Sequence, residues 1–156
     1  MARPRLHHYP ADEMLRSIAS VIQARRDALE AILADAVAEQ ADEAREQAKS
    51  NAEREAASLS YHEWGQLHPD PPRGDGWHRE YHAKRELAHL EEFGVPYSLA
   101  QFTGRSDLTP SARIAAQTTI RKLESSGLVD LFGAKAQSVR LTPTGWAAVG
   151  EPAHAP

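Results

Sequence analysis

The sequence predicts a mainly helical protein in which one long N-terminal helix precedes a small domain of helices and a β-hairpin. Three observations support this prediction. Residues 11–60 contain no Gly and no Pro. Residues 62–76 contain three Pro and three Gly, which favours an irregular connector. Residues 108–145 pass from a helical pattern through Gly127 into alternating apolar and polar residues, which indicates a helix followed by paired strands.

Residues 11–60 are rich in Ala, Glu, Gln, Arg and Leu, all residues of high helix propensity. We expect one helix of about 45–50 residues, roughly 70 Å long. Its first half has apolar residues in an a/d-like spacing, and its second half has a narrow stripe of Ala. The first-half residues are Leu15, Ile18, Ile22, Leu29 and Ile32.

Such a helix cannot bury an apolar face alone, so its stripe needs a partner. We expect two copies of residues 11–60 to pair as a homodimer. Packing of the helix against the C-terminal domain of its own chain, or a solvated charged helix, remains the alternative. The connector, residues 61–77, then separates this helix from a C-terminal domain over residues 78–150.

The first part of the C-terminal domain shows two helices. Residues 77–93 combine Tyr81, Leu87, Leu90 and Phe93 with charged residues, which is typical of an amphipathic helix. A shorter helix is expected at residues 98–102, because Ser98 is a favourable N-cap and Gly104 can end it.

A third helix begins at Pro110, where Thr109 can act as the N-cap, and ends near Gly127. Its apolar stripe is expected to include Ile114, Ala115, Ile120 and Leu123, all facing a core. Two antiparallel strands should follow, because Val129, Leu131, Val139 and Leu141 alternate with Asp130, Phe132 and Arg140, and the polar turn at residues 133–136 joins them.

A family resemblance lies in residues 108–145, which read LTPSARIAAQTTIRKLESSGLVDLFGAKAQSVRLTPTG. The order helix, Gly-Leu-Val, hairpin and Leu-Thr-Pro-x-Gly resembles the winged helix-turn-helix of bacterial regulators of the MarR and PadR type. The resemblance covers roughly residues 78–150. It implies that these residues form a winged helix-turn-helix domain with a two-stranded wing, so we expect a mainly α fold in which the long N-terminal helix precedes this domain.

In those families the helix before Gly-Leu-Val enters the major groove, and the hairpin contacts the flanking backbone. The resemblance therefore implies sequence-specific binding of duplex DNA, as in a prokaryotic, phage or plasmid transcriptional regulator. The chain departs from both families in its extra helix, which is N-terminal only, so neither subfamily nor effector pocket is implied. The alternative is a winged helix that serves as a protein-interaction scaffold without binding DNA.

The candidate DNA-binding residues lie on the helix after Pro110 and on the hairpin. Arg and Gln can form paired hydrogen bonds with guanine or adenine edges, while Ser, Thr and Lys can hold phosphates. Arg105 and Ser106, in the turn before this helix, are weaker candidates. The predicted contact residues are Ser111, Arg113, Gln117, Thr118, Arg121, Lys135 and Arg140.

Charge is distributed unevenly along the chain. Residues 1–60 hold eight Lys/Arg and eleven Asp/Glu, a net charge of −3, whereas residues 78–150 hold nine and seven, a net charge of +2. The C-terminal domain is therefore the basic part. A surplus of two is modest for binding a polyanion, and a dimer would double it.

Signatures of an enzyme are missing, because the sequence has no Gly-rich phosphate loop, no Gly-x-Ser-x-Gly and no Cys. His78 and His82 are four residues apart on a predicted helix, and His62, Glu63 or His68 could supply a third ligand. The order His-Arg-Glu-Tyr-His differs from the zinc-peptidase motif. We expect no enzymatic activity, no bound metal and no cofactor.

No apolar run approaches the roughly 20 residues that span a bilayer, and residues 1–10 lack the hydrophobic core of a signal peptide. We expect no membrane association and a cytoplasmic location. His7 and His8 are expected in a disordered N-terminus, and residues 151–156 in a frayed tail.

Overall fold

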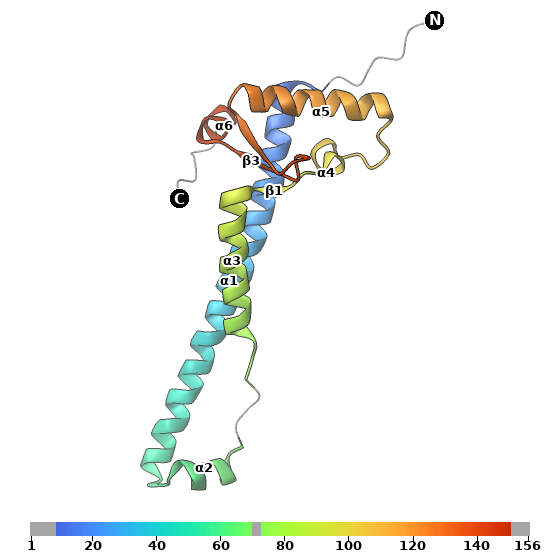
Figure 1. Ribbon diagram of the computed structural model, residues 1–156. Helices are drawn as coiled ribbons and strands as arrows, with labels where there is room; N and C mark the ends of the chain where they lie inside the picture. The colour runs from blue at the N-terminus through green and yellow to red at the C-terminus, as the bar shows by residue number, and fades with distance from the viewer. Residues whose placement is uncertain (1–8, 70–72, 151–156) are drawn as a thin grey trace, which may run out of the picture. The chain divides into compact units, whose positions relative to one another are not determined.

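The computed structural model describes residues 9–69 and 73–150, and it is mainly helical (Figure 1). The expectations for His7, His8 and residues 151–156 therefore lie outside the described residues. The elements, in chain order, are α1 (Ala11–Ala56), α2 (Tyr61–Leu67), α3 (Gly76–Phe93), β1 (Val95–Pro96), α4 (Leu99–Thr103), α5 (Pro110–Ser125), β2 (Val129–Phe132), β3 (Ser138–Leu141) and α6 (Pro143–Ala148).

The chain divides into two compact units. The terminal unit contains residues 1–28 and 86–156, and the central unit contains residues 29–85. Because α1 and α3 both run across these boundaries, each unit holds one part of each helix. The prediction of a long N-terminal helix is confirmed, with an end at Ala56.

A three-stranded antiparallel sheet lies in the terminal unit, in the order β1-β3-β2. In the β2–β3 hairpin Val129 pairs with Leu141 and Phe132 with Ser138. The third strand, β1, was not predicted, because Pro96 argued for the end of a helix. A two-residue strand at the sheet edge tolerates this Pro, since its missing N–H is not needed there.

The N-caps predicted for the two helices that precede the hairpin are present. Ser98 Oγ accepts a hydrogen bond from the Gln101 amide at 3.3 Å, and Gly104 ends α4 with φ of 70°. Thr109 caps α5 by accepting from the Ala112 amide at 3.2 Å. The final helix, α6, was not predicted, and it buries Trp146 in the terminal unit.

The apolar stripe at the start of α1 belongs to the core of the chain itself. Met14, Leu15, Ile18 and Ile22 are each at most 3% exposed. The Ser17 hydroxyl donates to the Phe102 carbonyl oxygen of α4, which ties α1 to the helices of the terminal unit.

The homodimer predicted through residues 11–60 stays a prediction. Within one chain, the first part of the stripe is already covered, and Leu29 further along it is also buried, at 2% exposed. Ile32 differs from the others because it is 42% exposed. The a/d-like spacing reflects the need for an apolar partner surface, and this chain supplies that surface.

In the central unit, α1 and α3 are held together by small residues and by charged side chains. Ala36 and Ala83 are buried, and a Cβ on Gly76 would lie 3.1 Å from the Ala36 carbonyl oxygen. Arg79 forms ion pairs with Asp75, Asp35 and Glu39. Gln40 donates to Glu80 at 2.7 Å.

The predicted irregular connector, residues 61–77, is partly helical. Ser60 caps α2 by accepting from the Glu63 amide at 3.2 Å, and Trp64 Nε1 donates to Ser50 Oγ at 3.0 Å. The connector prediction placed too much weight on Pro and Gly, because a side-chain cap and an aromatic anchor suffice for a helix of seven residues.

Replacing Gly94 by Ala is expected to destabilise the terminal unit by roughly 3 kcal/mol. Gly94 has φ of 76°, and an added Cβ would lie 1.8 Å from the Val139 carbonyl oxygen of β3. Urea denaturation monitored by circular dichroism measures this change.

Two other glycines serve as controls. Gly104 has φ of 70° but no atom within 4 Å of an added Cβ, so Gly104→Ala should cost only about 1 kcal/mol. Gly65 in α2 has free space and no positive φ, so Gly65→Ala should not be destabilising. Equal stability of all three variants would contradict the close packing of α3 and β3.

Candidate nucleic-acid interface

Helix α5 has one buried and one exposed face. The exposed side chains include five of the predicted DNA contacts: Ser111, Arg113, Gln117, Thr118 and Arg121. The buried face packs into the terminal unit and consists of Ala112, Ala116, Thr119, Ile120 and Leu123. At 3.6 residues per turn, Ile114 and Arg121 lie on the side of the helix opposite this buried face.

The orientation of α5 is fixed on its buried side. Ile120 is fully buried, and the Thr119 hydroxyl donates to the Tyr9 carbonyl oxygen at 2.9 Å. Thr109 and Pro110 fix its first turn. The helix therefore presents its polar face from a rigid support.

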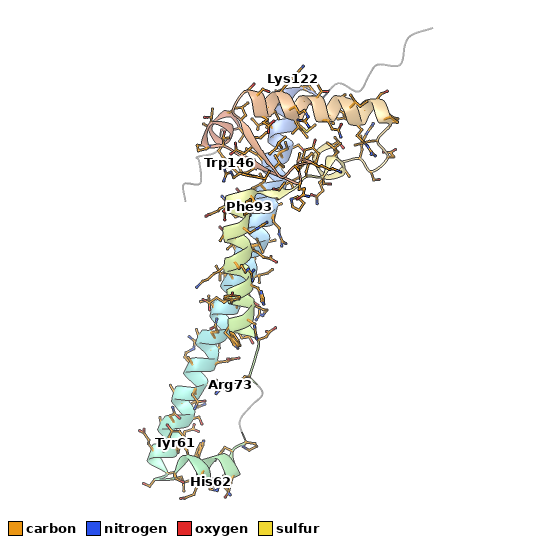
Figure 2. All side chains as sticks on the ribbon, viewed as in Figure 1. Tyr61, His62, Arg73, Phe93, Lys122 and Trp146 are labelled. Atoms are coloured by element: carbon orange, nitrogen blue, oxygen red, sulfur yellow. The ribbon has the colours of Figure 1, made fainter. Side chains whose placement is uncertain are left out.

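Ion pairing divides the exposed cations of the terminal unit. Arg16 and Arg25 pair with Asp12 and Glu86. A second group of described cations has no ion pair, and all of them are exposed: Arg113, Arg121, Lys122 and Lys135. These four cations lie on α5 and on the turn between β2 and β3, and Figure 2 shows Lys122 on the outer side of α5.

The β2–β3 turn presents Lys135 on a constrained backbone. Gly133 and Ala136 both have positive φ, 89° and 49°. The Gln137 amide donates to the Phe132 carbonyl oxygen at 2.7 Å and closes the turn. Lys135 lies within this closed turn and is exposed.

Arg140 does not belong to this group of free cations. Its guanidinium donates to Asp130 at 2.8 Å and to the Glu92 carbonyl oxygen at 2.7 Å, and it lies 4.9 Å from the centre of the Phe132 ring. These contacts join the hairpin to the end of α3. Since its donors are engaged within the fold, we remove Arg140 from the candidate interface.

Arg121 lies close to Tyr97, which follows β1. Burial raises the pKa of the Tyr97 phenol, and the positive charge of Arg121 opposes part of that rise. The Tyr97 amide donates to the Gln137 carbonyl oxygen at 2.9 Å. This hydrogen bond joins the end of β1 to the hairpin, and the charge of Arg121 on α5 acts on the same tyrosine.

Two side chains of α5 differ from their predicted roles. Ile114 was expected in the core but is 63% exposed, because the core is filled from the adjacent positions Ala112 and Ala116. Thr118 was expected to hold a phosphate, yet its hydroxyl donates to the Ile114 carbonyl oxygen at 2.8 Å. The weaker candidates Arg105 and Ser106 are exposed in the segment before α5.

The histidines of the central unit make ring contacts. The rings of His78 and His82 stack with centroids 6.1 Å apart, and His68 stacks on Trp64 at 3.8 Å. Within residues 9–69 and 73–150, no three His, Cys, Asp or Glu side chains are grouped as metal ligands would be.

Comparisons of the chain with protein-family models, with curated proteins and with solved structures gave no match. None of the described helices combines the length and the apolar character needed to cross a membrane.

Proposed function

We propose that this chain binds duplex DNA through the exposed face of α5, with the β2–β3 turn on the flanking backbone, as a transcriptional regulator in the cytoplasm of a prokaryote. The observation that carries the proposal is the placement of the unpaired cations. Arg113, Arg121, Lys122 and Lys135 are exposed without ion pairs, whereas Arg16, Arg25 and Arg140 are neutralised. Polyanion binding requires cations that are free to replace counterions.

The order of elements in the terminal unit also supports the proposal. The C-terminal part of α3 precedes β1, α4 and α5, and the β2–β3 hairpin follows. This order fits the winged helix-turn-helix resemblance, with α4 and α5 as the helix pair and the hairpin as the wing. On this interpretation α5 is the helix that enters the major groove.

The exposed side chains divide by their chemistry. Gln117 can form two hydrogen bonds with adenine, and Arg113 and Arg121 can do the same with guanine. Lys122 and Lys135 are point charges suited to phosphates, and Ser111 lies exposed in the first turn of α5, where its hydroxyl can donate to a phosphate. We assign sequence reading to the first group and positioning to the second.

The two phosphate-directed cations, Lys122 and Lys135, predict a weak salt dependence. If each contacts one phosphate, a plot of log K against log salt concentration should have a slope of about −1.8. Fluorescence anisotropy with a labelled duplex, measured between 50 and 250 mM salt, gives this slope. A slope near zero would contradict phosphate contacts by these side chains.

Single substitutions on the duplex chosen by selection from a random pool separate the two groups. Arg113→Ala or Gln117→Ala should cost about 1–3 kcal/mol of binding free energy on the selected duplex and much less on a random one. Lys135→Ala should weaken binding to both duplexes equally and make the salt slope shallower by about 0.9.

The matched control is Arg16→Ala, which removes one exposed positive charge that is paired with Asp12 and lies outside α5 and the hairpin. It should leave both affinities nearly unchanged. If selection enriches no sequence and all four variants lose the same small affinity at low salt, the DNA proposal is wrong. The terminal unit would then fit the protein-interaction alternative.

A further inference from the structure

The exposed face of α5 has an apolar side chain in its middle. Ile114 is 63% exposed, and it is flanked one turn later by Gln117 and Thr118 and two turns later by Arg121. Its side chain is not needed for the core, which Ala112, Ala116, Ile120 and Leu123 fill from the opposite side. The position therefore offers a branched aliphatic group to whatever contacts this face.

Thr118 extends the apolar character of this position. Its hydroxyl hydrogen is used in the 2.8 Å bond to the Ile114 carbonyl oxygen, so the side chain has no donor left for a phosphate. Thr118 is exposed, so its methyl group is the part of the side chain that can still contact a ligand. Residues four apart on a helix are neighbours, so Ile114 and the Thr118 methyl lie on the same part of α5.

The surroundings of this apolar pair favour a nucleic acid over an apolar protein surface. Arg113, Arg121 and Lys122 are exposed on the same helix without ion pairs, and Glu124 is the only acidic residue within α5. Positive charge around a small apolar contact is complementary to the DNA major groove. The one apolar group on base edges in that groove is the thymine 5-methyl.

We propose that Ile114, together with the Thr118 methyl, contacts the 5-methyl group of a thymine, so that the protein specifies thymine at that position of its site. This inference rests on the proposed function. It adds a means of recognising thymine that hydrogen bonds cannot provide, because thymine differs from uracil in this methyl group alone.

The test replaces each thymine of the selected duplex, one at a time, by deoxyuridine. This change removes a single methyl group and keeps the base pair. Wild-type affinity should fall about fourfold at one or two positions, the effect of losing one buried methyl group. With Ile114→Ala, the thymine and deoxyuridine duplexes should bind equally at those positions.

Comparing both proteins on both duplexes separates this contact from any change in DNA shape, because a shape effect would persist in Ile114→Ala. Ile114→Val should retain most of the discrimination. The matched control Val37→Ala shortens an aliphatic side chain that is 46% exposed in the central unit, and it should behave as wild type. Circular dichroism checks that Ile114→Ala remains folded.

Three outcomes would overturn the inference. A preferred duplex without any methyl-sensitive thymine removes the inference and leaves the proposed function standing. Equal sensitivity of wild type and Ile114→Ala shows that another residue contacts the methyl group. The absence of any preferred duplex overturns the proposed function and the inference together.

Discussion

Replacing Ile22 by Glu is expected to unfold the terminal unit. Ile22 is 3% exposed on α1, beside Ile18, which is fully buried. A carboxylate at this position would lose its hydration without gaining a partner, at a cost of several kcal/mol. Since a small domain is stable by only about 5–15 kcal/mol, this substitution removes a large part of the total.

Near-ultraviolet circular dichroism of the buried Trp146 and urea denaturation measure the loss. The matched control is Ile32→Glu, the same substitution on the same helix at a side chain that is 42% exposed. It should remain folded. If Ile22→Glu instead gives a folded monomer from a wild-type dimer, the stripe does pair between chains.

Reversing three of the free cations, as Arg121→Glu, Lys122→Glu and Lys135→Glu together, is expected to lower DNA affinity by at least about a hundredfold. The change removes two phosphate partners and one side chain that reads a base, and it places three negative charges against the DNA, where like-charge contacts cost several kcal/mol. Because all three side chains are exposed and unpaired, stability should change little.

The control for net charge is the triple variant Lys49→Glu, Arg73→Glu and Arg85→Glu. These cations are also exposed and without ion pairs, but they lie in the central unit. The variant has the same net charge as the first one. If both lose affinity equally, overall charge determines binding and the face of α5 has no special role.

Local signals in the sequence predicted the elements around α5 well. Thr109 and Pro110 mark its start, and Gly127 adopts φ of 73° after its end. Such caps depend on neighbouring residues only, so they are visible without a structure. The strand β1 was missed because its two residues are ordered by pairing with β3, a distant part of the chain.

The role of the α1 stripe could not be predicted, because apolar spacing shows that a face is buried but not what covers it. Met14, Leu15, Ile18 and Ile22 would have the same spacing in a homodimer. Ile114 illustrates the same limit within one helix. Alanine at 112 and 116 gives a weak apolar signal, so the larger Ile114 was assigned to the wrong face.

The charge of Asp130 gives a reason, visible in the sequence, to leave Arg140 out of the predicted DNA-binding residues. In the structure the hairpin pairs Val129 with Leu141, and the same register places Asp130 directly opposite Arg140. Opposite charges at such a position attract, and the structure places their charged groups 2.8 Å apart. A cation on a hairpin should therefore be compared with its cross-strand partner before it is assigned to DNA.

Amide chemical shifts of the isotope-labelled protein, recorded with increasing amounts of the selected duplex, test the central claim most directly. The proposal predicts the largest changes at Ser111, Arg113, Gln117 and Arg121 on α5 and at residues 133–137 of the hairpin turn, with small changes in α2. The largest changes in the central unit, or no changes at a concentration that saturates binding, would contradict the proposal that α5 and the hairpin form the DNA-binding surface.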